Sequence, residues 1–180
     1  AFHESLNMAA LWKLPCIYIV ENNRYGMGTA IERASAIYDV AQRACAYDMA
    51  SEAVDGMDVL AVREVVGRAV DLARGESLPT LIEARCYRFM GHSMSDPVHG
   101  HYRTKEEVEE QKLKDPIRRY FDVLEGQGLL DPAGLQKMDA EVRAIVDQAV
   151  EFADGSPEPP PEALFEDVYA VPYGPYTRSR

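Results

Sequence analysis

Residues 15–26 have the sequence PCIYIVENNRYG, and this stretch decides the fold class. Its first half is apolar and rich in β-branched and aromatic side chains, which indicates a buried strand over residues 15–20. Its second half is polar and contains a glycine, so the strand ends there. Because ligands of open α/β sheets bind outside the carboxyl ends of the strands, the polar half marks a candidate binding site.

Two neighbouring amides, Asn22 and Asn23, give this candidate site neutral oxygens and N–H donors. Gly26 and Gly28 allow the backbone to approach a bound group closely. These groups suit a magnesium-bridged phosphate, because Mg²⁺ prefers oxygen ligands and usually shares them with substrate phosphates. The alternative is an Asx turn that ends the strand, which is a common use of asparagine. The local sequence leaves both interpretations open.

Helix-like and strand-like patterns alternate through the first 88 residues. We predict helices over residues 2–12, 39–48 and 59–74, strands over 15–20, 51–54 and 80–87, and an irregular loop over 22–37. Asp58 is well placed to cap the third helix. Strands that alternate with helices pair in parallel through right-handed crossovers. The predicted fold class is therefore α/β, with a doubly wound, mostly parallel sheet.

Residues 89–103 differ from what precedes them. They contain glycine, proline, histidine and serine without periodicity, and such a long irregular run in a compact domain is usually functional or disordered. Thr104 and Glu107 form a capping box, which predicts that a helix begins there. Asp115 and Asp131 each precede a proline, an arrangement typical of the start of a helix. Three further helices are therefore expected.

The last of these helices has one apolar face, formed by Leu135, Met138, Val142, Ile145, Ala149 and Phe152. Residues 156–161 have the sequence SPEPPP, which predicts an extended strap. We assign residues 1–103 to the C-terminal part of an α/β domain, and residues 104–180 to a helical extension of the same domain.

The 180-residue chain has a formal net charge of −11, and 47% of its residues are hydrophobic. The negative charge argues against a nucleic-acid partner and against binding to anionic membrane surfaces. No apolar run approaches the roughly 20 residues that a membrane helix requires. Because a helix-like pattern is already present at Ala1, we expect a fragment whose front half is missing.

Three cysteines, Cys16, Cys45 and Cys86, show no Cys-x-x-Cys spacing. An odd number of cysteines without that spacing indicates neither a disulfide framework nor a zinc site. We expect all three to be small, buried hydrophobic side chains in a reducing compartment.

Four stretches together carry a family resemblance. They are Asn7–Pro15 (NMAALWKLP), Glu21–Thr29 (ENNRYGMGT), Val54–Asp58 (VDGMD) and Gly91–Pro97 (GHSMSDP). In this order they resemble the alpha subunits of the thiamine-diphosphate-dependent 2-oxo acid dehydrogenases, most closely those of the pyruvate dehydrogenase decarboxylating component. The resemblance extends from residue 1 to about residue 169. It implies a thiamine-diphosphate-binding fold, in which residues 89–103 form the active-site loop of the diphosphate-binding domain.

The resemblance also implies a set of cofactor ligands. Mg²⁺ and thiamine diphosphate would be held by the Asn23 side chain and the main-chain carbonyl of Tyr25, with Gly26 beside them. A third family ligand, the aspartate of a Gly-Asp-Gly turn, would lie upstream of Ala1. Without a carboxylate, two neutral oxygens would hold a hard dication poorly.

His92 matches a family histidine on a loop that orders over the cofactor. The resemblance implies that it contacts the cofactor, handles the intermediate and helps to pass it to a lipoyl group. The matches at Arg88, Asp96, Tyr102 and Arg103 imply that these residues order the loop. A zinc site formed by His92, His99 and His101 is a weaker alternative, because no carboxylate or thiolate completes a ligand set.

Ser93 matches a position that is phosphorylated in eukaryotic relatives, where the added charge could disorder the loop. Ala30 stands in place of another regulatory serine, and residues 98–101 replace a shorter, serine-containing stretch. These departures favour an unregulated bacterial member in the cytoplasm, with Ser93 as a simple loop hydroxyl. A eukaryotic member would lie in the mitochondrial matrix.

The activity implied by the resemblance is decarboxylation of pyruvate with acyl transfer to the lipoyl group of an acyltransferase. A beta subunit would supply the other half of the site in a heterotetramer of two alpha and two beta chains, so we expect this chain to be inactive alone. The matched motifs mostly touch the cofactor, so branched-chain 2-oxo acids and acetoin remain alternative substrates. A non-catalytic, partner-binding fragment is the alternative outside enzymes.

Overall fold

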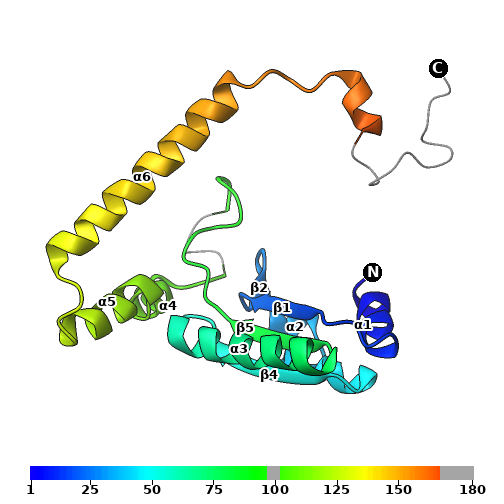
Figure 1. The fold of residues 1–180 in the computed structure, drawn as a ribbon. Coiled ribbons are helices and arrows are strands. Elements are labelled where there is room, and N and C mark those ends of the chain that lie inside the picture. The colour runs from blue at the N-terminus through cyan, green and yellow to red at the C-terminus, as the bar shows by residue number, and fades with distance from the viewer. Residues whose placement is uncertain (97–101, 167–180) are drawn as a thin grey trace. The chain divides into compact units, whose positions relative to one another are not determined.

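The computed structural model describes residues 1–96 and 102–166 (Figure 1). The chain divides into two compact units, Ala1–Leu130 and Asp131–Arg180, and each is described by itself. The assignment of residues 104–180 to an extension of the first domain stays a prediction.

A three-stranded parallel sheet forms the centre of the first unit. Its strands are β1 (Ile17–Asn22), β4 (Ala50–Asp55) and β5 (Thr80–Arg85), in the order β1-β5-β4. Ile17 of β1 and Ala50 of β4 both pair with Thr80, so the three strands begin and end level with one another. Their carboxyl ends therefore lie at one edge of the sheet, as the sequence predicted.

Helices cover both faces of this sheet. The helix α3 (Val59–Glu76) packs along one face, where the core consists of Val54, Val65, Ala69, Ile82 and Ala84 (Figure 1). The helices α1 (Phe2–Leu11) and η1 (Val40–Tyr47) cover the other face, around Leu6, Ala44, Met49 and Leu81. Consecutive residues of β5 thus enter opposite cores, as the two-residue period of a strand requires. The predicted α/β class is confirmed.

Two local predictions need correction. The segment predicted as an irregular loop contains an antiparallel hairpin of β2 (Tyr25–Gly26) and β3 (Thr29–Ala30), followed by the short helix α2 (Ile31–Ala34). In its two-residue turn, Met27 has a φ of 54°. Asparagine or glycine usually occupies such a position, so the methionine gave no signal of a hairpin in the sequence. The helix predicted over 39–48 is a 3-10 helix, η1.

Capping side chains start three helices where the sequence predicted. Asp58 accepts hydrogen bonds from the N–H groups of Leu60 and Ala61 at the start of α3. Thr104 accepts from Glu107 at the start of α4 (Lys105–Lys112). The helix α5 (Pro116–Gly126) begins at Pro116, after the cap Asp115.

The second unit is described to residue 166. It contains the long helix α6 (Pro132–Gly155), capped by Asp131, and the short 3-10 helix η2 (Pro161–Phe165). Residues 157–160 between them have no regular structure, in agreement with the predicted strap. Within the described part of this unit no residue of α6 is buried, and on the predicted apolar face Met138, Val142, Ile145, Ala149 and Phe152 are exposed while Leu135 is half-buried. None of the described helices is long and apolar enough to cross a membrane.

The three cysteines are free thiols. Cys16 and Cys86 are half-buried, but Cys45 is exposed. The expectation of a buried thiol was wrong for Cys45, because the residues that η1 buries are Ala41 and Ala44.

Gly56, which follows β4, has no room for a side chain. A Cβ atom there would overlap the Cys86 sulfur and lie 3.1 Å from the carbonyl oxygen of Arg85. Gly56→Ala is therefore expected to lower the free energy of unfolding by about 1–3 kcal/mol, measured by urea denaturation. Gly67→Ala is the matched control in α3, since no atom lies within 4 Å of its added Cβ. It should raise stability by about 0.5–1 kcal/mol, and equal effects at both sites would contradict the packing argument.

Candidate functional site

The asparagine pair at the end of β1 divides into two roles. The Asn22 side-chain oxygen accepts a hydrogen bond of 2.9 Å from the N–H of Arg24, whose φ is 63°. This is the Asx turn that the sequence offered as an alternative, and it is formed by Asn22 alone. The Asn23 side chain makes no hydrogen bond within the described residues, so its amide is available for another group.

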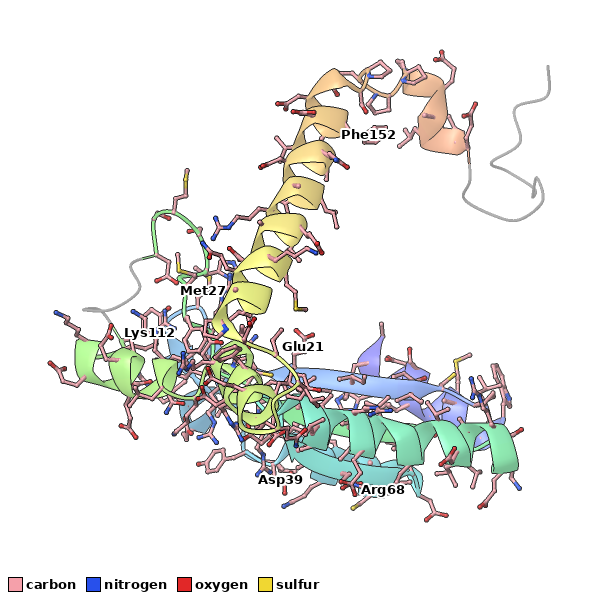
Figure 2. The ribbon with its side chains drawn as sticks, turned by 60° about the vertical axis from the view of Figure 1, so that its left-hand side comes forward. Glu21, Met27, Asp39, Arg68, Lys112 and Phe152 are labelled. Carbon is pink, nitrogen blue, oxygen red and sulfur yellow. The ribbon has the colours of Figure 1, made fainter. Side chains whose placement is uncertain are left out.

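A cavity of about 380 Å³ opens beside this turn. It is lined by Asn23, Tyr25, Gly26, Met27, Arg88, His92, Tyr102 and Arg103. Met27, labelled in Figure 2, belongs to the hairpin side of the lining, and the residues after β5 form the other side. The structure thus brings together all four predicted cofactor-binding residues. Of the predicted loop-ordering residues, three lie in the lining and Asp96 stands behind it.

Asp96 fixes the backbone that carries His92. Its Oδ2 atom accepts hydrogen bonds from the His92 N–H, at 2.7 Å, and from the Tyr102 hydroxyl, at 2.8 Å. The bond from the His92 backbone, followed by that from Tyr102, holds the pKa of Asp96 below its usual value. These bonds are therefore present at neutral pH and would be lost only as the pH falls through this lowered pKa. Ser93 is exposed and shares a hydrogen bond of 2.9 Å with Ser95.

Arg103 forms the wall of the cavity between two tyrosines. Its guanidinium carbon lies 5.8 Å from the ring centroid of Tyr87 and 5.0 Å from that of Tyr102. It is only 4% exposed and donates one hydrogen bond to the carbonyl of Arg88, while Nε and Nη2 have no partner in the described part of the chain. Burial, with a hydrogen bond to Glu107, raises the pKa of Tyr87 to about 12. The wall is therefore cationic and aromatic.

The lining chemistry suits an anion bridged to a metal ion. Arg88 and Arg103 contribute cationic groups and no carboxylate lines the cavity, so a phosphate would be favoured. The oxygens of Asn23 and Tyr25 are ligands of the kind that a hard divalent cation prefers. Among the described residues, no cluster of three His, Cys, Asp or Glu side chains could hold a metal. The residues thus fit the diphosphate end of a cofactor but supply no anionic metal ligand.

Several predicted residues lie outside the described part of the chain. They are Pro97, Val98, His99, Gly100 and His101, which include two members of the alternative histidine site. Sequence reasoning also missed one residue near the site, Glu83, whose side chain is fully buried beside Asn22. The available signal was an acid within the otherwise apolar strand 80–84, because a buried carboxylate requires partners.

Comparison with known proteins decides the family. A model of the family described as "Dehydrogenase E1 component" matches residues 1–162. This chain belongs to the dehydrogenase E1 component family. The predicted resemblance is therefore confirmed, and family members in general use thiamine diphosphate.

Several relatives of this dehydrogenase E1 component chain carry the same subunit name. The pyruvate dehydrogenase E1 component subunit alpha of Rhizobium meliloti (strain 1021) is 46% identical over 92% of this chain and 47% of its own length. The mitochondrial subunits of Sminthopsis macroura and Homo sapiens (somatic form) are 47% and 46% identical over 93% of this chain, and are covered over 46% and 42% of their lengths. The chain thus spans less than half the length of these relatives.

Proposed function

We propose that this chain is part of the alpha subunit of a pyruvate dehydrogenase decarboxylating component. One observation carries the proposal: Asn23, Tyr25 and Gly26 line the same cavity as His92, at the carboxyl edge of a parallel sheet. The two segments are far apart in the sequence, and the pairing of β1 with β5 brings them to the same edge of the sheet. The names of the relatives support the choice of pyruvate as the 2-oxo acid.

The proposed cofactors are thiamine diphosphate and Mg²⁺. The Asn23 side-chain oxygen and the Tyr25 carbonyl would bind the metal ion, and Gly26 would let the backbone approach the diphosphate. When bound, thiamine diphosphate would supply the nucleophile for decarboxylation of the 2-oxo acid. His92, at the exposed mouth of the cavity, would hold or release a proton during acyl transfer.

The proposed partners are a beta subunit and a lipoyl-bearing acyltransferase. The two neutral ligands of this chain need an anionic third ligand, and the remainder of the cofactor needs its own binding surface. We therefore propose that the rest of the alpha subunit and a beta subunit complete the site in a heterotetramer, and that this chain alone is inactive. The proposed location is the bacterial cytoplasm, or the mitochondrial matrix if the source is eukaryotic.

Calorimetric titration with Mg²⁺ and thiamine diphosphate tests this proposal. The complete alpha subunit with its beta subunit is expected to bind the cofactor at micromolar concentration and to decarboxylate pyruvate faster than branched-chain 2-oxo acids or acetoin. The isolated 180-residue chain is expected to show no binding, because it lacks a carboxylate ligand. Absence of binding in the complete assembly would leave only the partner-binding alternative. Micromolar binding by the isolated chain would contradict the shared site.

A further inference from the structure

Glu83 is a fully buried carboxylate on the central strand of the sheet. It lies on β5 with no exposed surface, level with Val20 of β1 and Ala53 of β4. Its Oε1 atom accepts a hydrogen bond of 2.7 Å from Nδ2 of Asn22, and Oε2 accepts one of 3.1 Å from the N–H of Ala41. A buried carboxylate is costly unless it is paired and hydrogen-bonded, so these partners are required by the position.

The Glu83 carboxylate fixes the orientation of the Asn22 amide. The Asn22 nitrogen must face Glu83 if the carboxylate accepts, and its oxygen must face the N–H of Arg24, which can only donate. A flipped amide would set an oxygen against the carboxylate and a nitrogen against the N–H. The hydrogen-bond partners on both sides therefore hold the amide in one orientation.

The Asn22 amide in turn fixes the path of the backbone into the cavity. Its bond to Arg24 closes the turn in which Arg24 adopts a positive φ, and Asn23 is the residue between them. The carbonyl of Arg24 then accepts from the N–H of Ile31, at 2.8 Å, which ties the turn to the far end of the hairpin. Tyr25 follows directly as the first residue of β2.

We propose that Glu83 is a positioning residue for the metal ligands, acting through Asn22 on the placement of Asn23 and Tyr25. This inference rests on the proposed function, because it concerns the same cofactor. Glu83 is not among the residues that line the cavity, and its fully buried side chain contacts Asn22, the residue before the first lining residue. Its effect on the cofactor is therefore indirect.

Two charged residues near Glu83, Arg85 and Asp39, connect it to the start of η1. Arg85 Nε lies 3.4 Å from Glu83 Oε1, and Arg85 Nη2 lies 3.3 Å from Asp39 Oδ1. Asp39, labelled in Figure 2, directly precedes η1. Through the N–H of Ala41, and through Arg85 to Asp39, Glu83 thus joins the start of η1 to the end of β1.

Two single variants and their combination test the inference in the complete alpha subunit assembled with its beta subunit. Glu83→Gln replaces one acceptor oxygen by a donor, so the side chain can no longer accept from both Asn22 and Ala41. Asn22→Asp removes the donor and places two carboxylates against each other. In the double variant N22D/E83Q, the amide at position 83 can donate to the carboxylate at position 22 and still accept from the N–H of Ala41. Both hydrogen bonds that connect β5 to Asn22 and Ala41 are thereby restored, while only the long contact of 3.4 Å from Arg85 Nε loses its acceptor.

Each single variant is expected to weaken binding of Mg²⁺ and thiamine diphosphate about 10–100-fold, as for other outer partners of metal ligands. The double variant should recover to within about threefold of the unsubstituted protein, because hydrogen-bonded neighbours couple non-additively. Glu52→Gln on β4 is the matched control, since that carboxylate is exposed and pairs with Arg68. It should leave cofactor affinity unchanged.

The outcomes separate positioning from a purely structural role. Single variants that lower the melting temperature but leave cofactor affinity within about twofold would overturn the inference. A double variant no better than the singles would overturn it as well. If a single variant does not fold, recovery of both folding and affinity in the double variant supports the inference. Failure of the unsubstituted protein to bind the cofactor would overturn the proposed function, and the inference with it.

Discussion

Replacement of Asn23 by alanine is expected to raise the Mg²⁺ concentration that the assembled enzyme needs for activity, while leaving the fold intact. The side chain makes no hydrogen bond within the described residues, so its removal leaves no buried partner unsatisfied. Under the proposed function, its oxygen is one of two metal ligands that this chain supplies. The concentration of Mg²⁺ needed for half-maximal activity should therefore rise by at least about 100-fold, beyond the effect typical of outer partners.

Asn23→Asp is the matched control for this prediction. It keeps an oxygen at the same position and adds the negative charge that Mg²⁺ favours, so magnesium-dependent activity should largely be retained. The melting temperatures of both variants, measured without cofactor, should equal that of the unsubstituted protein. An alanine variant with an unchanged magnesium requirement would show that Asn23 is not a metal ligand.

The parts of the fold that the sequence predicted well are those that local chemistry determines. The caps of α3, α4, α5 and α6 were all predicted, because each acceptor side chain lies within three residues of the N–H group that it binds. The parallel sheet was predicted from the alternation of apolar runs. The order β1-β5-β4 was not, because strand order depends on contacts distant in the sequence.

The hairpin over residues 25–30 was missed for a local reason. Its turn uses Met27 in a left-handed conformation, which a side chain other than glycine or asparagine seldom adopts. Gly26 and Gly28 indicated a turn in this region, but Met27 in its first position did not indicate a two-residue hairpin. The bond from the Ile31 N–H to the Arg24 carbonyl stabilises it in the structure.

The family resemblance assigned the metal to Asn23, but the local sequence by itself did not separate the roles of Asn22 and Asn23. Asn22 and Asn23 are adjacent and chemically identical, so the sequence could not say which of them ends the strand. The answer depends on Glu83, which lies 61 residues from Asn22 along the chain. A buried carboxylate there binds the first amide and leaves the second for the cavity.

Gly91→Ala is expected to reduce the rate of catalysis by about 100-fold with little change in the stability of the sheet. An added Cβ would overlap the carbonyl oxygen of Asp96 and lie 2.9 Å from its carbonyl carbon. Both atoms belong to the backbone, so no side-chain rotation can relieve the overlap. The turn would have to open, which separates Asp96 from the N–H of His92. A displacement of about 1 Å at a reacting group is enough for an effect of this size.

Gly126→Ala in α5 is the matched control, because no atom lies within 4 Å of its added Cβ. It should leave both the rate and the protease sensitivity of the protein unchanged. In Gly91→Ala, cleavage by a non-specific protease within residues 89–96 should accelerate, because the opened turn exposes backbone that Asp96 now holds. The apparent affinity for Mg²⁺ should change less than the rate, since Asn23 and Tyr25 lie on the opposite wall. Full activity together with rapid cleavage would show that the position of His92 does not limit the reaction.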